Sequence, residues 1–341
     1  GTGTGGGTNG TETGTGGEGG TGNAYTGQLQ VEETAADDRF PFVTGESAAP
    51  IVVDDEDAAV VEIAASAVAE DVGSVAGSAP AVETDLPDDA DRVVLAGSVS
   101  GSEHVGRLVE DEAFDAAHVA DGQWESFVVT VVEDPYEGVD EAFVVAGSDA
   151  RGAAYGLFEL SEAAGVSPWV WWADAPTADM DALHVTAGHY EFGPPSVQYR
   201  GVFLNDTDWG LLPWASETFE PEYGNIGPKT YAQIFELLLR LDANYVWPAM
   251  HGDYYKDMEV FYGNFEKQEV ADRYSIVVGT AHNEPMLVNP HAWDEDEYGE
   301  YNYVSNPEGV RRAWRDRAEA TAGSENVYQL GMRGAGDTAM A

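Results

Sequence analysis

The chain has 341 residues and a formal net charge of −47, because 62 Asp and Glu residues face only 15 Lys and Arg residues. This charge excludes a protein that binds nucleic acid through a basic surface, since no cationic stripe is available for phosphates. Cysteine is absent, which excludes disulfides, thiolate catalysis and cysteine-ligated zinc. No apolar run reaches the roughly 18 residues of a membrane span.

The acidic residues spread through the whole chain and do not collect in one tail. This pattern predicts a salt-adapted surface, on which salt screens the repulsion between carboxylates. The Debye length falls to about 3 Å near 1 M salt. At low salt we expect self-repulsion to destabilise the compact state.

Residues 1–45 are predicted to be a disordered tail, because the opening GTGTGGGTNGTETGTGGEGGTG is a Gly/Thr tract that cannot form a core. Tracts of this kind often tether exported proteins. We therefore expect an extracellular or surface-tethered protein whose signal peptide is not in this sequence, which begins at Gly1.

Residues 46–190 are predicted to form a small α/β domain. Gly147, Gly152 and Gly156 fit neither the dinucleotide-binding fingerprint nor the P-loop, so we expect them to allow close contact between a helix and a sheet. The segment WVWW at 169–172 is predicted to wedge this domain against the next one. The expected strands are 50–54, 91–98, 125–133 and 141–149, and the expected helices are 58–77 and 150–165.

After a Gly/Pro linker, residues 197–341 alternate regularly between apolar strands and helices. Strand and helix units in series predict a parallel sheet. We interpret this region as the first four βα units of a (β/α)8 barrel, so the fold class is α/β throughout. The expected strands are 199–206, 244–251, 276–285 and 326–334, and the expected helices are 230–243, 269–275 and 307–322.

Each of the four expected barrel strands ends in polar or aromatic residues. In a (β/α)8 barrel these ends converge on one face, which carries the active site. An aromatic ring, planar amides, carboxylates and a guanidinium together suit a sugar ligand. The residues are Asn205 and Asp206 on the first strand, Trp247 and His251 on the second, His282 and Glu284 on the third, and Arg333 and Asp337 on the fourth.

Other interpretations of these residues stay open at this point. Any single polar strand end is commonly only a turn, and Trp247 could pack between barrel layers. The pair His282-x-Glu284 occurs in zinc deaminases, but that chemistry needs cysteine ligands. A metal-dependent hydrolase using His251, His282, Glu284 and Asp337 is one alternative, and a non-catalytic sugar-binding module is another.

Five segments, in order, resemble glycoside hydrolase family 115, the xylan α-1,2-glucuronidases. They are GSDARGAAYGLFELSEAAGVSPWVWWAD (147–174), VQYRGVFLND (197–206), FELLLRLDANYVWPAM (235–250), GTAHNEPM (279–286) and GMRGAGD (331–337). The resemblance covers about residues 48–341. It implies a small α/β domain followed by a (β/α)8 barrel. It also implies removal of glucuronic or 4-O-methylglucuronic acid from glucuronoxylan or aldouronic acids, with inversion and without a cofactor.

By position, Asn205, Asp206, Arg333 and Asp337 match residues that line the glucuronic-acid pocket of the family, with the two aspartates as the catalytic candidates. His282 and Glu284 fall in the matching motif of the third strand, and with Trp247 and His251 they complete the expected substrate site. Three segments depart from the usual family pattern and bear on fine specificity. They are Asn283, where a second histidine is common, Ala335, where a carboxylate is common, and Thr338, in DTAM where DEPM is usual.

The chain ends after the fourth expected strand, whereas a complete barrel takes about 250 residues. An inverting glycosidase needs an acid and a base about 6.5–9.5 Å apart. In the family the proposed acid lies on a later strand. We therefore expect this chain to be the N-terminal portion of a glucuronidase, inactive alone, with the remaining half of the barrel as its partner.

Overall fold

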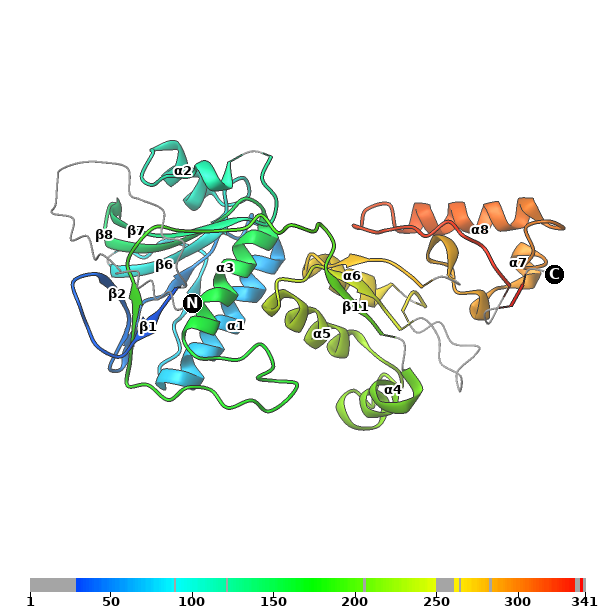
Figure 1. Ribbon diagram of the computed structural model, residues 1–341, viewed down its shortest axis with the longest axis horizontal. Helices are drawn as coiled ribbons and strands as arrows, with labels where there is room; N and C mark the ends of the chain where they lie inside the picture. The colour runs from blue at the N-terminus through cyan, green and yellow to red at the C-terminus, as the bar shows by residue number, and fades with distance from the viewer. Residues whose placement is uncertain are drawn as a thin grey trace, which may run out of the picture.

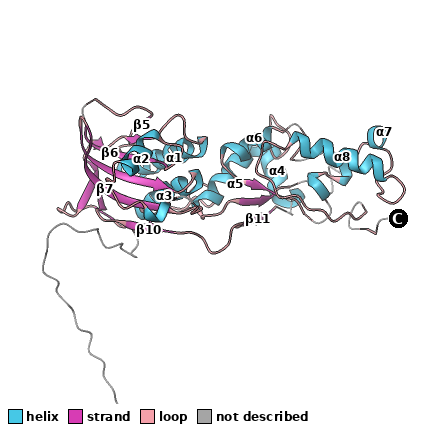
Figure 2. Cartoon of the chain, turned by 90° about the horizontal axis from the view of Figure 1, so that it is seen from above, coloured by secondary structure: helices cyan, strands magenta, loops and turns pink. Residues whose placement is uncertain are grey.

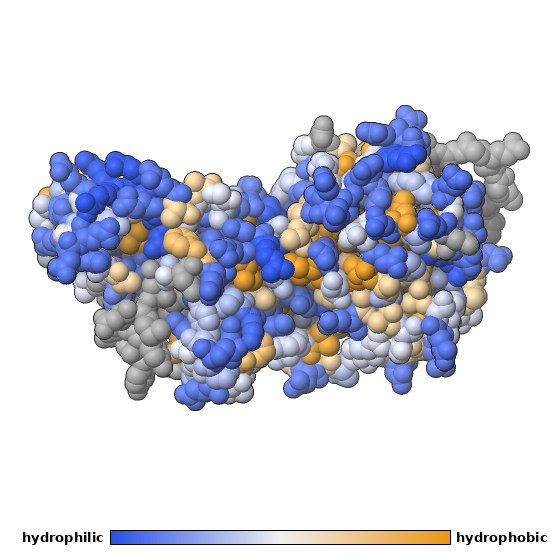
Figure 3. Space-filling model, turned by 180° about the vertical axis from the view of Figure 1, so that it is seen from behind, coloured by the Kyte–Doolittle hydropathy of each residue, from blue (hydrophilic) through white to orange (hydrophobic). Residues whose placement is uncertain are grey.

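The computed structural model describes residues 29–88, 90–120, 122–204, 207–249, 261–263, 265–281, 284–334 and 338–339. The chain is elongated, with an N-terminal part and a C-terminal part that follow one another along the long axis (Figure 1, Figure 2). Seen from behind, the surface is mostly hydrophilic, and hydrophobic residues gather near the middle of the long axis (Figure 3). None of the described helices is both long and apolar enough to cross a membrane.

The N-terminal part is built on a six-stranded mixed sheet in the order β10-β7-β8-β6-β4-β5. At its centre β6 and β8 run parallel, with Val94 opposite Phe143, and β7 joins β8 as an antiparallel hairpin. The sheet confirms the predicted α/β class. Its strands are β4 (Ile51–Val52), β5 (Val82–Glu83), β6 (Ala90–Ser98), β7 (Phe127–Tyr136), β8 (Val139–Gly147) and β10 (Tyr190–Phe192).

Helices α1 (Ala59–Ala76) and α3 (Ala150–Ala163) cover one face of this sheet, and α2 (Glu103–Glu110) covers the other (Figure 1). A Cβ on Gly152 would lie 2.3 Å from the carbonyl oxygen of Ser126, and one on Gly156 would lie 2.5 Å from a methyl of Val145. At Gly147 a Cβ would lie 2.2 Å from the amide of Ala153. The predicted role of these glycines in helix–sheet packing is confirmed.

A second sheet corrects the prediction that residues 1–45 are disordered throughout. Its order is β1-β9-β2-β3, from β1 (Val31–Glu32), β2 (Arg39–Thr44), β3 (Ser47–Ala48) and β9 (Ala182–Thr186). Both β1 and β2 pair with β9, so a strand about 140 positions later in the chain orders this segment. Local composition could not reveal that pairing. Residues 1–28 lie outside the described residues.

The C-terminal part contains three parallel strands in the order β11-β12-β13, with helices between them. Helix α5 starts at a proline, which suits the first helical turn because no N–H is needed there. This alternation confirms the predicted strand–helix pattern of a partial (β/α)8 barrel. The main elements are β11 (Gly201–Phe203), α5 (Pro228–Arg240), β12 (Tyr245–Trp247), α6 (Glu266–Arg273), β13 (Val277–Val278) and α8 (Pro307–Ala320).

Shorter helical turns decorate the same part of the chain. They are η2 (Thr207–Leu211), α4 (Leu212–Trp214), η3 (Ala215–Phe219), η4 (Pro285–Leu287), η5 (Pro290–Ala292) and α7 (Glu295–Tyr298), and η1 (Ala117–Val119) belongs to the N-terminal part.

The predicted fourth strand, 326–334, is not a regular strand. Only Asn326 bridges to Val278, and further along the amide of Met286 donates to the carbonyl of Gln329. The reason lies in β13, which ends at Val278 and turns away. The Thr280 hydroxyl donates to the carbonyl of Glu284 at 2.7 Å and holds that turn, which leaves the fourth segment no strand to pair with.

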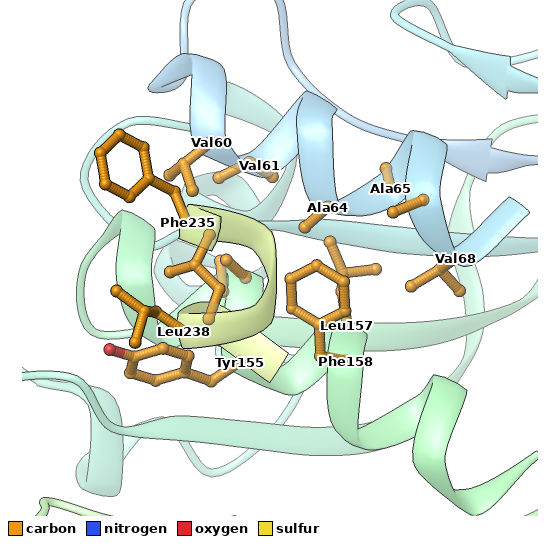
Figure 4. Packing of buried hydrophobic residues seen from close by; sticks show 14 of the residues in the cluster. Val60, Val61, Ala64, Ala65, Val68, Tyr155, Leu157, Phe158, Phe235 and Leu238 are labelled. Atoms are coloured by element: carbon orange, nitrogen blue, oxygen red, sulfur yellow. The ribbon is translucent and has the colours of Figure 1, made fainter. Parts of the chain in front are cut away.

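The two parts share one core where α5 meets α1 and α3. Phe235 and Leu238 of α5 belong to the same buried cluster as Val60 of α1 and Tyr155 of α3 (Figure 4). All four side chains are buried. The junction is therefore packed with apolar side chains.

An ion-pair network adds to this core at the start of the barrel strands. Glu125 accepts hydrogen bonds from Arg151, at 2.7 Å, and from Arg200, just before β11, at 2.6 Å. It also accepts one from Asn244, just before β12, at 2.5 Å. Arg151 reaches further, to Glu325 just before the fourth segment. The N-terminal part therefore covers the amino ends of the strands, and their carboxyl ends point away from it (Figure 1).

Candidate functional site

The carboxyl ends of β11, β12 and β13 lie at one edge of the parallel sheet. The amide of Leu204 donates to the carbonyl of Trp247 at 2.9 Å, and the amide of Gly279 donates to that of Val246 at 2.9 Å. These bonds align the last residue of each strand. The residues that follow the strands therefore start from neighbouring positions, as a barrel active site requires.

Of the eight predicted site residues, Trp247, Glu284 and Arg333 are within the described residues. The other five lie outside them: Asn205, Asp206, His251, His282 and Asp337. Their roles remain predictions, and the structure contributes the backbone positions from which they follow. Among the residues that the structure does describe, no group of three or more His, Cys, Asp or Glu side chains could hold a metal ion.

Aromatic side chains line the face of the strands that lies away from α5. Phe203 and Trp247 are paired in register, and their rings meet edge to face at 5.3 Å. The Trp247 indole donates to the Tyr245 hydroxyl at 2.7 Å, and Tyr199 contacts the Tyr245 ring at 5.6 Å. Phe203 is 44% exposed. This face offers flat rings next to the strand ends, which suits a sugar better than a purely apolar barrel layer would.

Two glycines make room for these rings. A Cβ on Gly201 would lie 1.6 Å from the carbonyl oxygen of Tyr245, so no larger residue fits while β11 stays paired with β12. A Cβ on Gly279 would lie 1.9 Å from the Tyr245 hydroxyl and 2.9 Å from the Trp247 indole nitrogen. The position of Trp247 therefore depends on glycine at 279.

Glu284 follows the turn after β13, and its side chain is only 1% exposed. Burial, reinforced by the charge of Glu284, raises the pKa of Tyr301 to about 12. A buried carboxylate at a strand end is suited to orienting neighbouring groups. This geometry favours a positioning role for Glu284 over direct exposure to ligand.

Arg333 is half-buried at the end of the irregular fourth segment. Directly after it, Gly334 and Thr338 form an antiparallel bridge, with the Gly334 amide donating to the Thr338 carbonyl at 3.0 Å. Residues 335–337, which include Asp337, lie outside the described residues.

One exposed aromatic residue was not predicted. Trp209 lies on η2, the helical turn that follows the predicted pair Asn205-Asp206, and it is 87% exposed. The sequence feature that could have predicted it is a tryptophan three positions after the polar pair Asn205-Asp206. An indole this exposed beside a strand end is a second candidate platform for a sugar ring.

Residues 192–341 match the model of a family described as glycosyl hydrolase family 115. The chain is also similar to the solved structure of a family GH115 4-O-methyl-α-glucuronidase, BtGH115A, with specificity for decorated arabinogalactans. Identity is 35% and the TM-score 0.74, over 88% of this chain and 37% of that chain. The chain therefore spans well under half the length of that enzyme.

Other solved glycosidases are much less similar. A GH20 β-N-acetylhexosaminidase from Streptomyces coelicolor A3(2) is 14% identical with a TM-score of 0.40, over 75% of this chain and 45% of that chain. CpGH84D is 9% identical with a TM-score of 0.41, over 85% of this chain and 41% of that chain. These two carry no argument here. A comparison with curated proteins gives no match.

Proposed function

Because residues 192–341 match glycosyl hydrolase family 115 and the chain resembles one of its solved members, we propose that this chain is the N-terminal part of a glycoside hydrolase of that family. The proposed reaction is removal of glucuronic or 4-O-methylglucuronic acid from the side chains of a polysaccharide. The observation that carries the proposal is the 35% identity and TM-score of 0.74 over 88% of this chain.

Xylan is the polysaccharide that the sequence motifs favour, with an α-1,2 linkage to the uronic acid. The related solved enzyme is described as specific for decorated arabinogalactans. Both substrates present the same terminal uronic acid, and they differ in the neutral sugars that carry it. The proposal is therefore made for the uronic acid, with xylan as the first backbone to test.

Arg333 would recognise the uronic acid through its carboxylate. A guanidinium binds a carboxylate with two parallel hydrogen bonds. On a chain with a net charge of −47, an anionic sugar also needs a local cation. Trp247 would support the sugar ring, and Asn205 would hydrogen-bond its hydroxyls.

Asp206 and Asp337 would supply carboxylates for the hydrolysis. Inversion requires an acid that protonates the leaving oxygen and a base that activates water on the opposite face of the ring. We assign Asp206 and Asp337 to the water and the sugar hydroxyls, and expect the acid to come from a later barrel strand. This assignment predicts that the present chain binds the uronic acid without hydrolysing its glycosides.

Binding can be measured directly by calorimetry with 4-O-methylglucuronic acid at high salt. Arg333→Ala should weaken binding by about tenfold or more, because a hydrogen bond to a charged group contributes about 1.5–3 kcal/mol. Arg315→Ala removes an exposed arginine of α8 and serves as the control. Equal affinities for both variants would contradict the assigned role of Arg333.

Hydrolysis can be tested by measuring uronic acid release from glucuronoxylan and from glucuronic-acid-decorated arabinogalactan. We expect no turnover by this chain, and turnover once the remaining barrel strands are joined to it. Turnover by the present chain that Asp206→Ala abolishes would contradict the expected inactivity, while supporting the hydrolase itself.

The proposed substrate also bears on location. Polysaccharides are too large to enter a cell intact, so an enzyme that trims them acts outside it or on its surface. We propose export, together with the salt-adapted surface that the net charge of −47 favours.

A further inference from the structure

A cavity of about 1070 Å³ lies beside the junction of the two parts. Its walls come from α1, from the segment that contains WVWW, from residues 210–214 and from α5. Of the residues predicted for the uronic-acid site, the structure describes Trp247, Glu284 and Arg333, and none of these three lines it. Within the described part of the chain, the cavity and the predicted uronic-acid site share no residue.

One wall of the cavity is a cluster of aromatic rings. Trp214 stacks on Phe219 at 5.0 Å with an interplanar angle of 7°. Trp171 meets Trp172, Trp214 and Phe219 edge to face, with ring centroids at 4.9, 6.0 and 5.1 Å. These contacts fix the orientation of the Trp171 ring while leaving the residue 39% exposed.

The two neighbouring tryptophans have different roles. The Trp172 indole donates to the carbonyl of Gln233 on α5 at 3.1 Å, which fastens the WVWW segment to the barrel part. This bond supports the predicted wedge at that residue. Trp171 makes no such bond with the rest of the described chain, and its ring faces the cavity. Packing the two parts together does not require the Trp171 ring to be exposed, so its exposure calls for another explanation.

The lining also carries hydrogen-bond acceptors with a net negative charge. Among the described residues of the lining, Arg240 is the only basic one, and its charge is already neutralised. It donates to Asp71 at 2.7 Å and to Glu236 at 2.9 Å. Glu70 and Asp174 add two further carboxylates to the lining. The cavity thus accepts hydrogen bonds from hydroxyl groups and repels anions.

We propose that this cavity binds neutral sugar units of a polysaccharide, with the Trp171 ring under the flat face of a sugar and Glu70 and Asp174 accepting its hydroxyls. The choice of a polysaccharide rests on the proposed function, whereas the preference for a neutral sugar rests on the cavity. The negative lining disfavours the uronic acid that Arg333 would bind. The chain would then hold the neutral backbone at one place and the charged side chain at another.

A cationic ligand fits this geometry less well. Sites for quaternary ammonium groups surround the cation with several ring faces. Here Trp214 and Phe219 cover each other by stacking, and Trp171 alone offers an exposed ring. A single platform beside acceptors matches a sugar, which has one flat apolar face and hydroxyls around its rim.

The test is calorimetry of the whole chain with xylotetraose and, separately, with a neutral galacto-oligosaccharide. At least one should bind, and Trp171→Ala should lower that affinity about tenfold, as expected for losing an aromatic contact and its buried area. Trp169→Ala is the matched control, because Trp169 is 47% exposed in the same segment and does not line the cavity. It should leave the affinity unchanged within about twofold.

Trp171→Tyr separates a binding role from a folding role. It keeps a flat ring and should retain most of the affinity, and circular dichroism and the thermal midpoint report whether Trp171→Ala still folds. Three results would overturn the proposal: no binding of either neutral oligosaccharide, equal loss in the Trp169 and Trp171 variants, or tighter binding of choline or glucuronic acid at this cavity. Because Trp171 is not part of the uronic-acid site, none of these results decides the Arg333 experiment.

Discussion

Replacing Glu125 with alanine would remove the carboxylate that the two parts of the chain share. Its side chain is 1% exposed, and it accepts hydrogen bonds from Arg151 at 2.7 Å, Arg200 at 2.6 Å and Asn244 at 2.5 Å. The substitution leaves two guanidinium groups facing an apolar methyl group. We expect it to loosen the junction without disturbing the six-stranded sheet.

The size of the expected loss in unfolding free energy depends on which other contacts Arg151 and Arg200 retain. Removing one member of a buried ion pair costs about 3–5 kcal/mol, because the other member is left buried and unpaired. Arg151 retains its pair with Glu325 at 2.7 Å, and Arg200 retains the carbonyl of Asp242 at 2.7 Å. Both guanidiniums are also partly exposed, at 18% and 21%. We therefore expect a loss near the lower limit, about 3 kcal/mol.

The assay is urea unfolding at fixed high salt, followed by circular dichroism. Glu137→Ala is the control, because Glu137 is exposed in the turn between β7 and β8. Glu125→Gln should cost less than Glu125→Ala, since the amide oxygen still accepts from one partner. If the free energies of unfolding of Glu125→Ala and Glu137→Ala agree within about 0.5 kcal/mol, the ion-pair network does not stabilise the junction.

Three further outcomes are expected. Tyr301→Phe should raise stability by about 1 kcal/mol in urea unfolding, because the buried hydroxyl has no partner within the described chain; a loss of stability would contradict this. Burial raises the pKa of Tyr301 to about 12, whereas in the unfolded chain the phenol ionises near pH 10. The free energy of unfolding of the parent chain should therefore fall as the pH rises from about 10 through 12, and Tyr301→Phe should lose less stability across that window. Gly201→Ala should destabilise the barrel part in hydrogen exchange, because its Cβ would lie 1.6 Å from the Tyr245 carbonyl, whereas Gly323→Ala enters open space; equal exchange would contradict the β11–β12 register. Lowering salt from about 1 M to about 0.01 M lengthens the Debye length from about 3 to about 30 Å and should lower the thermal midpoint; an unchanged midpoint would contradict a salt-adapted surface.

Features decided by neighbours close in sequence were predictable. Gly147 is the last residue of β8, Gly152 and Gly156 lie on the helix that follows it, and their packing role follows from their spacing and is confirmed. The predicted start of a helix at Pro307 is confirmed by α8, whereas α5 starts at Pro228, two residues before the predicted start. In each case the spacing along the chain carries the signal, even where the contacted atom is distant in sequence, as Ser126 is from Gly152.

Features decided by distant pairing were not predictable. The barrel strands are shorter than predicted. A strand ends where its neighbour in the sheet turns away, as β13 does at Thr280, and the residue pattern of the strand itself does not reveal that point. The strands at Val31–Glu32 and Arg39–Thr44 depend on β9.

The candidate site also combines features that the sequence predicts with features that depend on distant packing. Residue types at strand ends indicated a sugar site, whereas the exposure of Trp209 and Trp171 depends on packing that no single stretch reveals.

The network around Glu125 has a consequence for the order of folding. Its partners come from the starts of successive barrel units: Arg200, Asn244 and, through Arg151, Ser275 and Glu325. During synthesis the N-terminal domain emerges first and folds as a unit. The first residue of each new strand can then bind to the folded N-terminal domain, which fixes the spacing between the strands. Without such a template, the distant strand pairings of a parallel sheet form slowly. The N-terminal domain would thus act as a nucleation surface for the barrel, and nascent chains lacking it should be prone to strand-edge aggregation.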